Sequence, residues 1–200
     1  MRKTVMAAAL AGLLASPALG EGIPDLPAPS GEGLPFALGG DFSLTDQDGQ
    51  RRTQADPAGR PQLLFFGYAS CEQICSVALP MMADTVAGLE QNGIAVTPVM
   101  ITVDPARDTP EVMGDRLRDF HPDFVGLTGS ESDLARAYEA FNVEFEPVYV
   151  DPFYGEVFAH GSFVYLLDAE GRFLTLFPPI LAPERVAEIV RSHIEPAAQG

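Results

Sequence analysis

Two continuous apolar runs separated by a helix-length segment constrain the fold of this chain more than any other feature. Residues 62–66 read QLLFF, and residues 94–103 read IAVTPVMITV. Uninterrupted apolar runs of this kind are typical of strands that are buried on both faces of a parallel sheet. The segment between them, from about Cys75 to Gln91, is predicted to be a helix, which Asn92-Gly93 ends. This order of strand, helix and strand predicts a right-handed parallel crossover.

The remaining elements follow from capping residues and from strand and turn patterns. In chain order they are a short strand within 36–44, helices at 109–120 and 130–141, a β-like segment at 143–150, a hairpin at 162–177 and a helix at 182–193. Together with the crossover, they predict an α/β protein with a thioredoxin-like fold, in which a central mixed β-sheet is flanked by helices in a single domain. Ligands of such sheets bind outside the carboxyl ends of the strands.

The first twenty residues predict an export signal that is not part of the fold. A basic start, an uncharged apolar stretch over residues 4–15 and small residues before Glu21 form the pattern of a secretory signal peptide. The apolar stretch is short for a membrane span, and an uncleaved anchor is the alternative. Residues 21–35 are rich in Pro and Gly and are predicted to be a flexible lead-in, which leaves 36–195 as the domain. We therefore expect an exported, periplasmic protein that is soluble or loosely membrane-associated.

The charge of the chain limits its partners. Loss of Arg2 and Lys3 with the signal would leave ten basic residues against 28 acidic ones, so the formal net charge of −16 would become −18. A surface this acidic argues against nucleic acid or an anionic membrane as a partner. It is compatible with a cationic partner or with metal-ion traffic, although solubility is the simpler explanation.

The only two cysteines, Cys71 and Cys75, follow the first apolar run at the start of the predicted helix. A helix N-terminus favours the thiolate and lowers the pKa of a thiol. Four residues apart on a helix, the two Cβ atoms would be separated by roughly 5–6 Å. That range permits either a disulfide or a shared metal ion, so the site can alternate between the two. In an exported protein, a single structural disulfide is the plain alternative.

Two thiolates seldom complete a metal site, so a third ligand is sought among the three histidines. His193 lies near the chain end, and His121 lies at a helix end, where a histidine often interacts with the helix dipole. His160 lies in a predicted loop before the hairpin, and in this fold that loop meets the start of the first helix. His160 is therefore the candidate ligand, although a loop histidine more often only forms hydrogen bonds. Two cysteines and one histidine suit copper better than a closed structural zinc site.

Four ordered motifs make the sequence resemble the SCO/SenC family, the copper-binding thioredoxin-like proteins of cytochrome c oxidase assembly. They are Gly67-Tyr68 before the cysteines, VDPARDTP at 103–110, FHPDFVGLTGS at 120–130, and His160 before SFVYLLDAEGRF. The resemblance extends over most of the chain after the lead-in. It implies copper ligation by Cys71, Cys75 and His160, a reversible Cys71–Cys75 disulfide, and copper delivery toward the CuA centre of oxidase subunit II. Another copper chaperone or a thiol–disulfide reductant is a further implied partner, and His121 is expected to be structural.

The sequence departs from the family pattern close to the cysteines. The family usually has proline after each cysteine, where this chain has Glu72 and Ser76, and Gly161 follows the histidine where Ser or Thr is common. Loss of proline predicts a looser loop and cysteines that oxidise more readily. In the VDPARDTP segment, Asp104 and Arg107 are expected to pair near the site.

The leading function is a copper metallochaperone, which is a binding protein more than an enzyme. A thiol–disulfide reductase that keeps the CuA cysteines reduced would use Cys71 and Cys75 as a catalytic pair and would not need His160. A peroxiredoxin-type peroxidase needs Pro-x-x-x-Thr-x-x-Cys, but Leu64 and Tyr68 occupy the first two conserved positions. A structural disulfide requires buried cysteines that are never reduced, and so short a span constrains the unfolded chain little.

Overall fold

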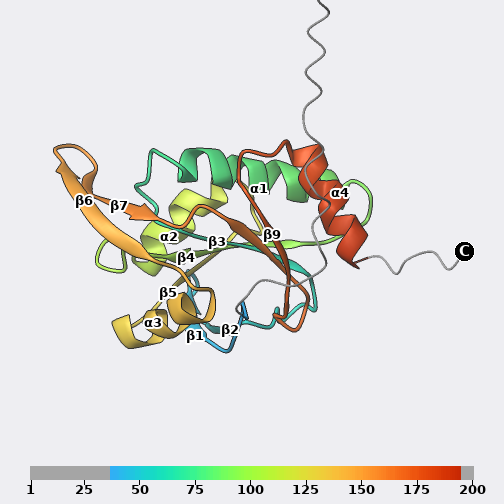
Figure 1. Ribbon diagram of the computed structural model, residues 1–200, viewed down its shortest axis with the longest axis horizontal. Helices are drawn as coiled ribbons and strands as arrows, with labels where there is room; N and C mark the ends of the chain where they lie inside the picture. The colour runs from blue at the N-terminus through green and yellow to red at the C-terminus, as the bar shows by residue number, and fades with distance from the viewer. Residues whose placement is uncertain (1–36, 195–200) are drawn as a thin grey trace, which may run out of the picture. The chain divides into compact units, whose positions relative to one another are not determined.

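A seven-stranded mixed sheet forms the centre of the computed structural model, which describes residues 37–194 (Figure 1). The predicted signal peptide and lead-in therefore lie outside the described residues. The elements in chain order are β1 (Ser43–Asp46), β2 (Arg51–Thr53), β3 (Gln62–Gly67), α1 (Cys75–Glu90), β4 (Thr97–Thr102), α2 (Pro110–Arg118), β5 (Val125–Thr128), α3 (Glu131–Ala140), β6 (Phe145–Asp151), β7 (Gly155–His160), β8 (Val164–Leu167), β9 (Phe173–Phe177) and α4 (Pro183–Ile194).

The sheet has the strand order β2-β1-β5-β4-β3-β8-β9. Its centre is parallel, because β4 pairs in parallel with both β3 and β5. Strands β1 and β8 then add antiparallel neighbours to β5 and β3. Helices α1 and α4 cover one face, and α3 lies on the other (Figure 1). The predicted thioredoxin-like fold with a mixed, helix-flanked sheet is confirmed.

The two apolar runs form the central strands, as predicted. All six residues of β3 and all six of β4 are buried. Successive side chains of β3 point to opposite faces. Phe66 packs against Tyr138 and Phe141 at α3, whereas Phe65 meets the ring of His160 on the other face. Burial of each such side chain stabilises the fold by roughly 1.5–3 kcal/mol.

Local signals set the helix ends. The Thr109 side chain accepts a hydrogen bond from the Val112 N–H ahead of Pro110, the first residue of α2. Ser130 caps α3 in the same way, through the N–H of Asp133. Pro80 lies beyond the first turn of α1. Because proline has no N–H, it removes one backbone hydrogen bond from the helix interior. None of the helices within residues 37–194 is long and apolar enough to span a bilayer.

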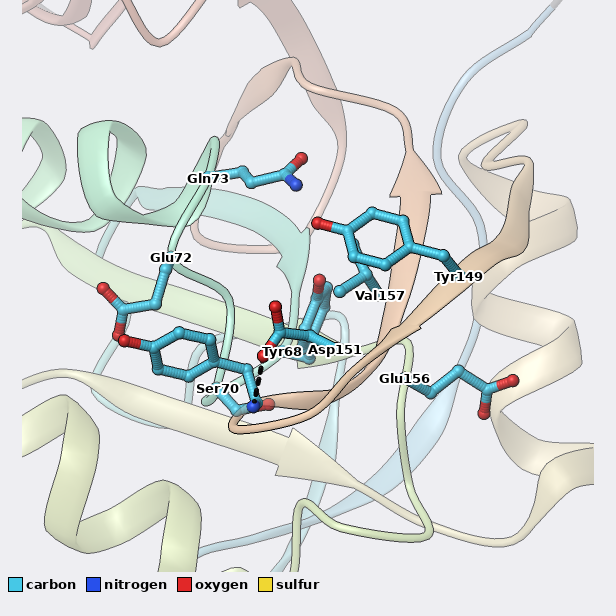
Figure 2. Close-up of a pocket in the computed structure, with 9 residues that line it drawn as sticks. Tyr68, Ser70, Glu72, Gln73, Tyr149, Asp151, Glu156 and Val157 are labelled. Atoms are coloured by element: carbon cyan, nitrogen blue, oxygen red, sulfur yellow. Dashed lines mark hydrogen bonds between the residues drawn. The ribbon is translucent and has the colours of Figure 1, made fainter.

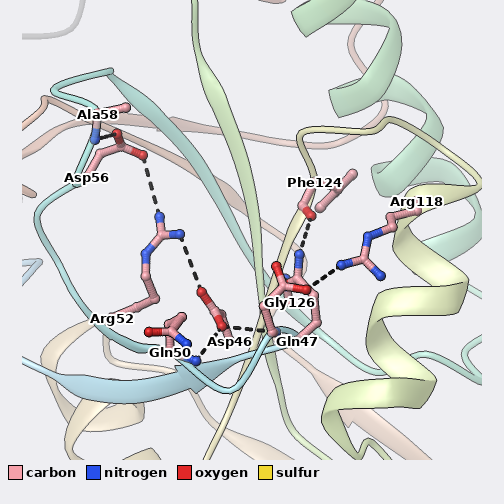
Figure 3. A network of polar contacts seen from close by, with 10 residues as sticks. Asp46, Gln47, Gln50, Arg52, Asp56, Ala58, Arg118, Phe124 and Gly126 are labelled. Carbon is pink, nitrogen blue, oxygen red and sulfur yellow. Dashed lines mark hydrogen bonds and ion pairs between the residues drawn. The ribbon is translucent and has the colours of Figure 1, made fainter.

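Strand β2 was not predicted, and a polar network attaches its hairpin with β1 to the sheet (Figure 3). Asp46 accepts the N–H groups of Asp48 and Gln50 at 3.0 and 2.8 Å and lies 3.7 Å from the Arg52 guanidinium. The Gln47 amide donates to the Phe124 carbonyl and accepts the Gly126 N–H, which joins β1 to the β5 region. The bonds of Gln47 join residues that are far apart in the chain, so no local sequence pattern predicts them.

The second unpredicted strand is β7, which pairs with β6 in a separate two-stranded sheet. Figure 1 shows this hairpin projecting beside the main sheet. Six of the seven residues of β6 are exposed. This strand confirms the β-like segment predicted at 143–150, whereas β7 was not predicted, because its exposed and buried residues follow no regular period. One consequence is a correction: His160 ends a strand and does not lie in a loop.

Candidate metal centre

The cysteines lie at the end of β3, where the chain turns into α1. The Cys71 N–H donates to the Tyr68 carbonyl at 3.1 Å, which closes the turn, and Cys75 is the first residue of α1. Cys71 therefore precedes the helix, and its predicted placement on a shared helix face is wrong. Both side chains are buried, with exposed fractions of 3% and 1%, and both thiols are free.

Gly67 lets the Cys75 sulfur pack against the end of β3. A Cβ at Gly67 would lie 2.9 Å from Cys75 Sγ and 2.7 Å from the Phe65 ring. Neither distance is compatible with ordinary van der Waals contact. The glycine before Tyr68 is thus a requirement of close packing beneath the cysteines.

His160 reaches the sulfurs from the end of β7. Its Nε2 lies 3.9 Å from Cys75 Sγ, and its Nδ1 lies 3.0 Å from the Gly161 carbonyl oxygen. Donation of the Nδ1 proton to that carbonyl leaves the Nε2 lone pair facing the sulfur, the arrangement that a metal-ligating histidine needs. The rings of Phe65 and Tyr68 meet the imidazole with centroids 5.9 Å away in both cases.

The three ligand atoms form a compact set. The two sulfurs and an imidazole nitrogen all lie within 4.8 Å of one another. With bonds of about 2.0–2.3 Å, ligands on one three-coordinate ion lie roughly 4 Å apart, so a small contraction would close the set. Within residues 37–194, no fourth His, Cys, Asp or Glu joins this group. Two thiolates and one imidazole form a soft, three-coordinate donor set.

The two thiols have opposite protonation preferences. Hydrogen bonding from Cys75 lowers the pKa of Cys71 to about 4 despite its burial. Burial, followed by the effect of Cys71, raises the pKa of Cys75. These opposite shifts favour a metal-free pair that holds one proton between the two sulfurs. An ion bound by both sulfurs must displace that proton.

The VDPARDTP segment at 103–110 connects the loop after β4 to the hairpin that carries His160. The predicted Asp104–Arg107 pair forms, and the Arg107 guanidinium also donates to the backbone carbonyls of Tyr154 and Glu156 at the tip of the β6–β7 hairpin. Gly155 lies between them with a φ of +78°, and a Cβ there would collide with Arg107. Arg107 thus ties the hairpin that carries His160 to the loop after β4.

Asp108 is a supporting residue that the sequence analysis missed. Its buried carboxylate accepts the Ala69 N–H at 3.1 Å and the Thr102 hydroxyl at 2.6 Å, so it joins the cysteine turn to β4. Burial raises the pKa of Asp108 to about 6. Its signal in the sequence was a second acidic residue close behind a buried strand.

The other two histidines lie outside the cluster. The buried His121 accepts the Asp123 N–H at Nδ1, and its Nε2 lies 3.6 Å from Glu90, which fits the expected structural role. His193 lies on α4 and contacts the Ile189 carbonyl. Of the two residues that stand in place of proline, Ser76 donates to the Gln73 carbonyl at 2.6 Å, a contact that proline does not make.

These features define a thioredoxin-like protein with a soft-metal site. The chain belongs to the SCO1/SenC family, whose profile matches residues 31–195. An SCO2-like protein of Rickettsia felis is 38% identical over 159 residues, which cover 78% of this chain and 77% of the relative. The structure of Arabidopsis thaliana ScoI with copper bound aligns with a TM-score of 0.74 at 30% identity, covering 79% of this chain and 98% of that one. Copper-bound ScoI of Bradyrhizobium japonicum aligns at 0.70 and 31% identity, covering 79% and 100%.

Proposed function

We propose that this chain is a copper metallochaperone. It binds one copper ion through Cys71, Cys75 and His160 and delivers it toward the CuA centre of cytochrome c oxidase subunit II. The observation that carries the proposal is the convergence of two sulfurs and one imidazole nitrogen within 4.8 Å. Support comes from family membership and from the two copper-bound Sco structures that the chain resembles.

The chemistry of the donor set suits loading and release. Thiolates favour soft Cu(I), and imidazole accommodates either copper state. Loading releases the proton that the cysteine pair holds, and release of copper returns it. A three-coordinate ion accepts an entering thiolate from a partner, so transfer proceeds by ligand exchange. Copper would come from another copper chaperone. Export to the periplasm stays a prediction from residues 1–20.

An anaerobic Cu(I) titration of the reduced protein tests the proposal. We expect one tight equivalent, and His160→Ala should weaken the affinity at least about 100-fold, because loss of a ligand should cost no less than loss of an outer-shell partner, which costs about 10–100-fold. His193→Ala is the matched control and should leave the affinity unchanged, because His193 lies on α4 away from the cluster. Absence of tight binding would refute the chaperone function, and equal affinity of the His160 variant would exclude that ligand.

One observation favours a second function, thiol–disulfide reduction of the CuA cysteines. The lowered pKa of Cys71, about 4, makes it a thiolate at neutral pH. It would attack a partner disulfide and release one partner thiolate. Cys75 would then attack Cys71, releasing the second partner thiolate and forming the Cys71–Cys75 disulfide, with two electrons passed to the partner. A thiol–disulfide reductant would restore the pair.

Burial opposes this reductase, because Cys71 is only 3% exposed and a disulfide must reach it. The same variants separate the two functions. Reduction of an oxidised CuA domain should persist in His160→Ala if the chain is a reductase, whereas copper transfer should fall. Loss of both reactions in that variant would contradict an independent reductase.

A further inference from the structure

A hollow lies beside the metal centre, between the cysteine loop and the β6–β7 hairpin (Figure 2). It has a volume of about 170 Å³. Tyr149 and Tyr154 come from the hairpin side, and Glu72 and Gln73 come from the loop between the cysteines. Figure 2 shows the Tyr149 ring pointing across toward Gln73, with Tyr68 between the two sides.

The hollow is strongly acidic. Glu72, Asp151 and Glu156 all line it. The nearest cations do not neutralise them. Arg107 is already paired with Asp104 and with two backbone carbonyls. Arg116 approaches Glu72 only to 3.9 Å, between two exposed side chains, and such a pair contributes little.

Aromatic rings stand next to these carboxylates and are open to solvent. Tyr149 and Tyr154 both line the hollow and are 51% and 50% exposed. Aromatic faces beside carboxylates attract a guanidinium or ammonium group through cation–π contacts. The chain already uses this combination once, since the Arg107 guanidinium lies 6.0 Å from the centroid of the Tyr68 ring.

A hydroxyl without a partner adds an independent feature. Ser70, which also lines the hollow, has a buried Oγ atom. It is one of two buried side-chain nitrogen or oxygen atoms without a hydrogen-bond partner in the part of the chain that the structure describes. An unpaired buried hydroxyl destabilises the fold, and an entering N–H donor would satisfy it.

We propose that this hollow receives a basic side chain, arginine or lysine, of the protein that exchanges copper with the site. The identity of that protein rests on the proposed function; the chemistry of the hollow does not. Position supports a docking role, because Glu72 is next to Cys71 in the chain and the Tyr68 ring contacts His160. A cation bound in the hollow would bring its protein next to Tyr68, whose ring contacts His160. The negative charge of the hollow would also steer the approach of a basic partner.

The first experiment uses a small probe and does not depend on copper. N-acetyl-arginine methylamide is titrated into the reduced, copper-free protein, and amide shifts are followed by NMR. We expect saturable shifts at Tyr149, Asp151 and Val157, absent with N-acetyl-norleucine methylamide. The double variant Tyr149→Leu/Glu156→Gln should weaken binding at least fivefold, whereas Glu139→Gln on α3 removes one carboxylate elsewhere and should not. Shifts that do not saturate, or that the double variant leaves unchanged, overturn the proposal.

The second experiment measures copper transfer to the isolated, copper-free CuA domain of subunit II. The double variant should keep the Cu(I) affinity of the wild type within twofold and transfer copper about 10-fold more slowly, with less dependence on salt. Equal transfer rates despite weakened arginine binding would overturn the docking role. Failure of the wild type to bind copper would refute the chaperone function instead, and the arginine titration would still decide the hollow.

Discussion

The candidate metal centre draws its two sulfurs and its imidazole nitrogen from two regions that are built differently. Cys71 and Cys75 follow β3, a fully buried strand with paired neighbours on both sides. His160 ends β7, whose partner strand β6 is exposed at six of seven positions. The sulfur pair is therefore preformed by the core, while the imidazole is carried by a peripheral arm.

The arm meets the core mainly through aromatic contacts, since His160 meets the rings of Phe65 and Tyr68 and Phe158 packs against Tyr68. The Phe158 N–H donates to the Tyr68 hydroxyl at 3.4 Å, and the rings of Phe145 and Tyr138 meet at 4.9 Å. Arg107 adds its bonds to the hairpin tip. Regions with few buried contacts open at low free energy. We therefore expect the site to open on the histidine side while the two sulfurs stay in place.

Hydrogen exchange tests this contrast directly and should show the largest effect. Amides of β3, at Leu64 to Phe66, should exchange on the order of 1000-fold more slowly than amides of β6, at Val148 to Val150, because β3 opens only with the core. Cu(I) should slow exchange in the hairpin and leave β3 unchanged. Equal protection of the two strands in the metal-free protein would remove the distinction between core and arm.

Asp108 tests the core side through pH. Its pKa of about 6 lies above the ordinary 3.8, so the folded protein holds this proton more tightly than the unfolded chain does. Raising the pH from 4 to 7 removes the proton from the folded protein, and this lowers the free energy of unfolding. The Asp108→Asn variant has no carboxyl at this position, so its stability does not fall with pH for this reason. From pH 4 to pH 7 the variant should gain up to about 3 kcal/mol relative to the wild type.

Urea unfolding of the reduced, metal-free proteins across this pH range measures the difference. The lowered pKa of Cys71 has the opposite effect on stability, which rises with pH above about 4. Both proteins carry Cys71, so its titration cancels in the comparison. Parallel curves for the two proteins would show that the Asp108 carboxyl is not shifted by its burial.

Gly67 tests how closely the core supports the sulfurs. Gly67→Ala places a Cβ within 2.9 Å of Cys75 Sγ, and relief of this overlap should cost about 2 kcal/mol of stability. Gly88→Ala on α1 is the matched control, because a Cβ there meets nothing within 4 Å. The control should be neutral or slightly stabilising. Equal stability of the two variants in thermal unfolding would contradict the close packing.

The core side was predictable from sequence, whereas only one strand of the arm was predicted, the β-like segment at 143–150 that forms β6. The runs at 62–66 and 94–103 give β3 and β4 because a strand buried on both faces is apolar at every position. That pattern also places the cysteines at the end of β3. Nothing comparable marks β7, since Gly155 to His160 mix exposed and buried positions without a regular period. The segment pairs only with β6, and such a pairing has no signal in its own residues.

The site shows the same division. The spacing of Cys71 and Cys75 and the position of His160 indicated a shared site, and the structure brings the three side chains together. Their role as copper ligands stays a prediction. The supports were partly visible: Asp104 and Arg107 were expected to pair, but the bonds of Arg107 to the hairpin depend on a turn about 47 residues further along the chain. Contacts of that range follow from the fold and not from local pattern.

Arg107 provides the smallest and most specific test of the arm. Arg107→Gln removes the bonds to the Tyr154 and Glu156 carbonyls, so the hairpin tip should exchange faster and His160 should be less well positioned. We expect Cu(I) affinity to fall about 10-fold, as for outer-shell partners of a metal-ligating histidine. Arg172→Gln, at an exposed position with its own acidic partners, is the control. A 10-fold loss of affinity without faster hairpin exchange would place the effect of Arg107 on the cysteine side, whereas faster exchange at unchanged affinity would show that the imidazole does not depend on the arm.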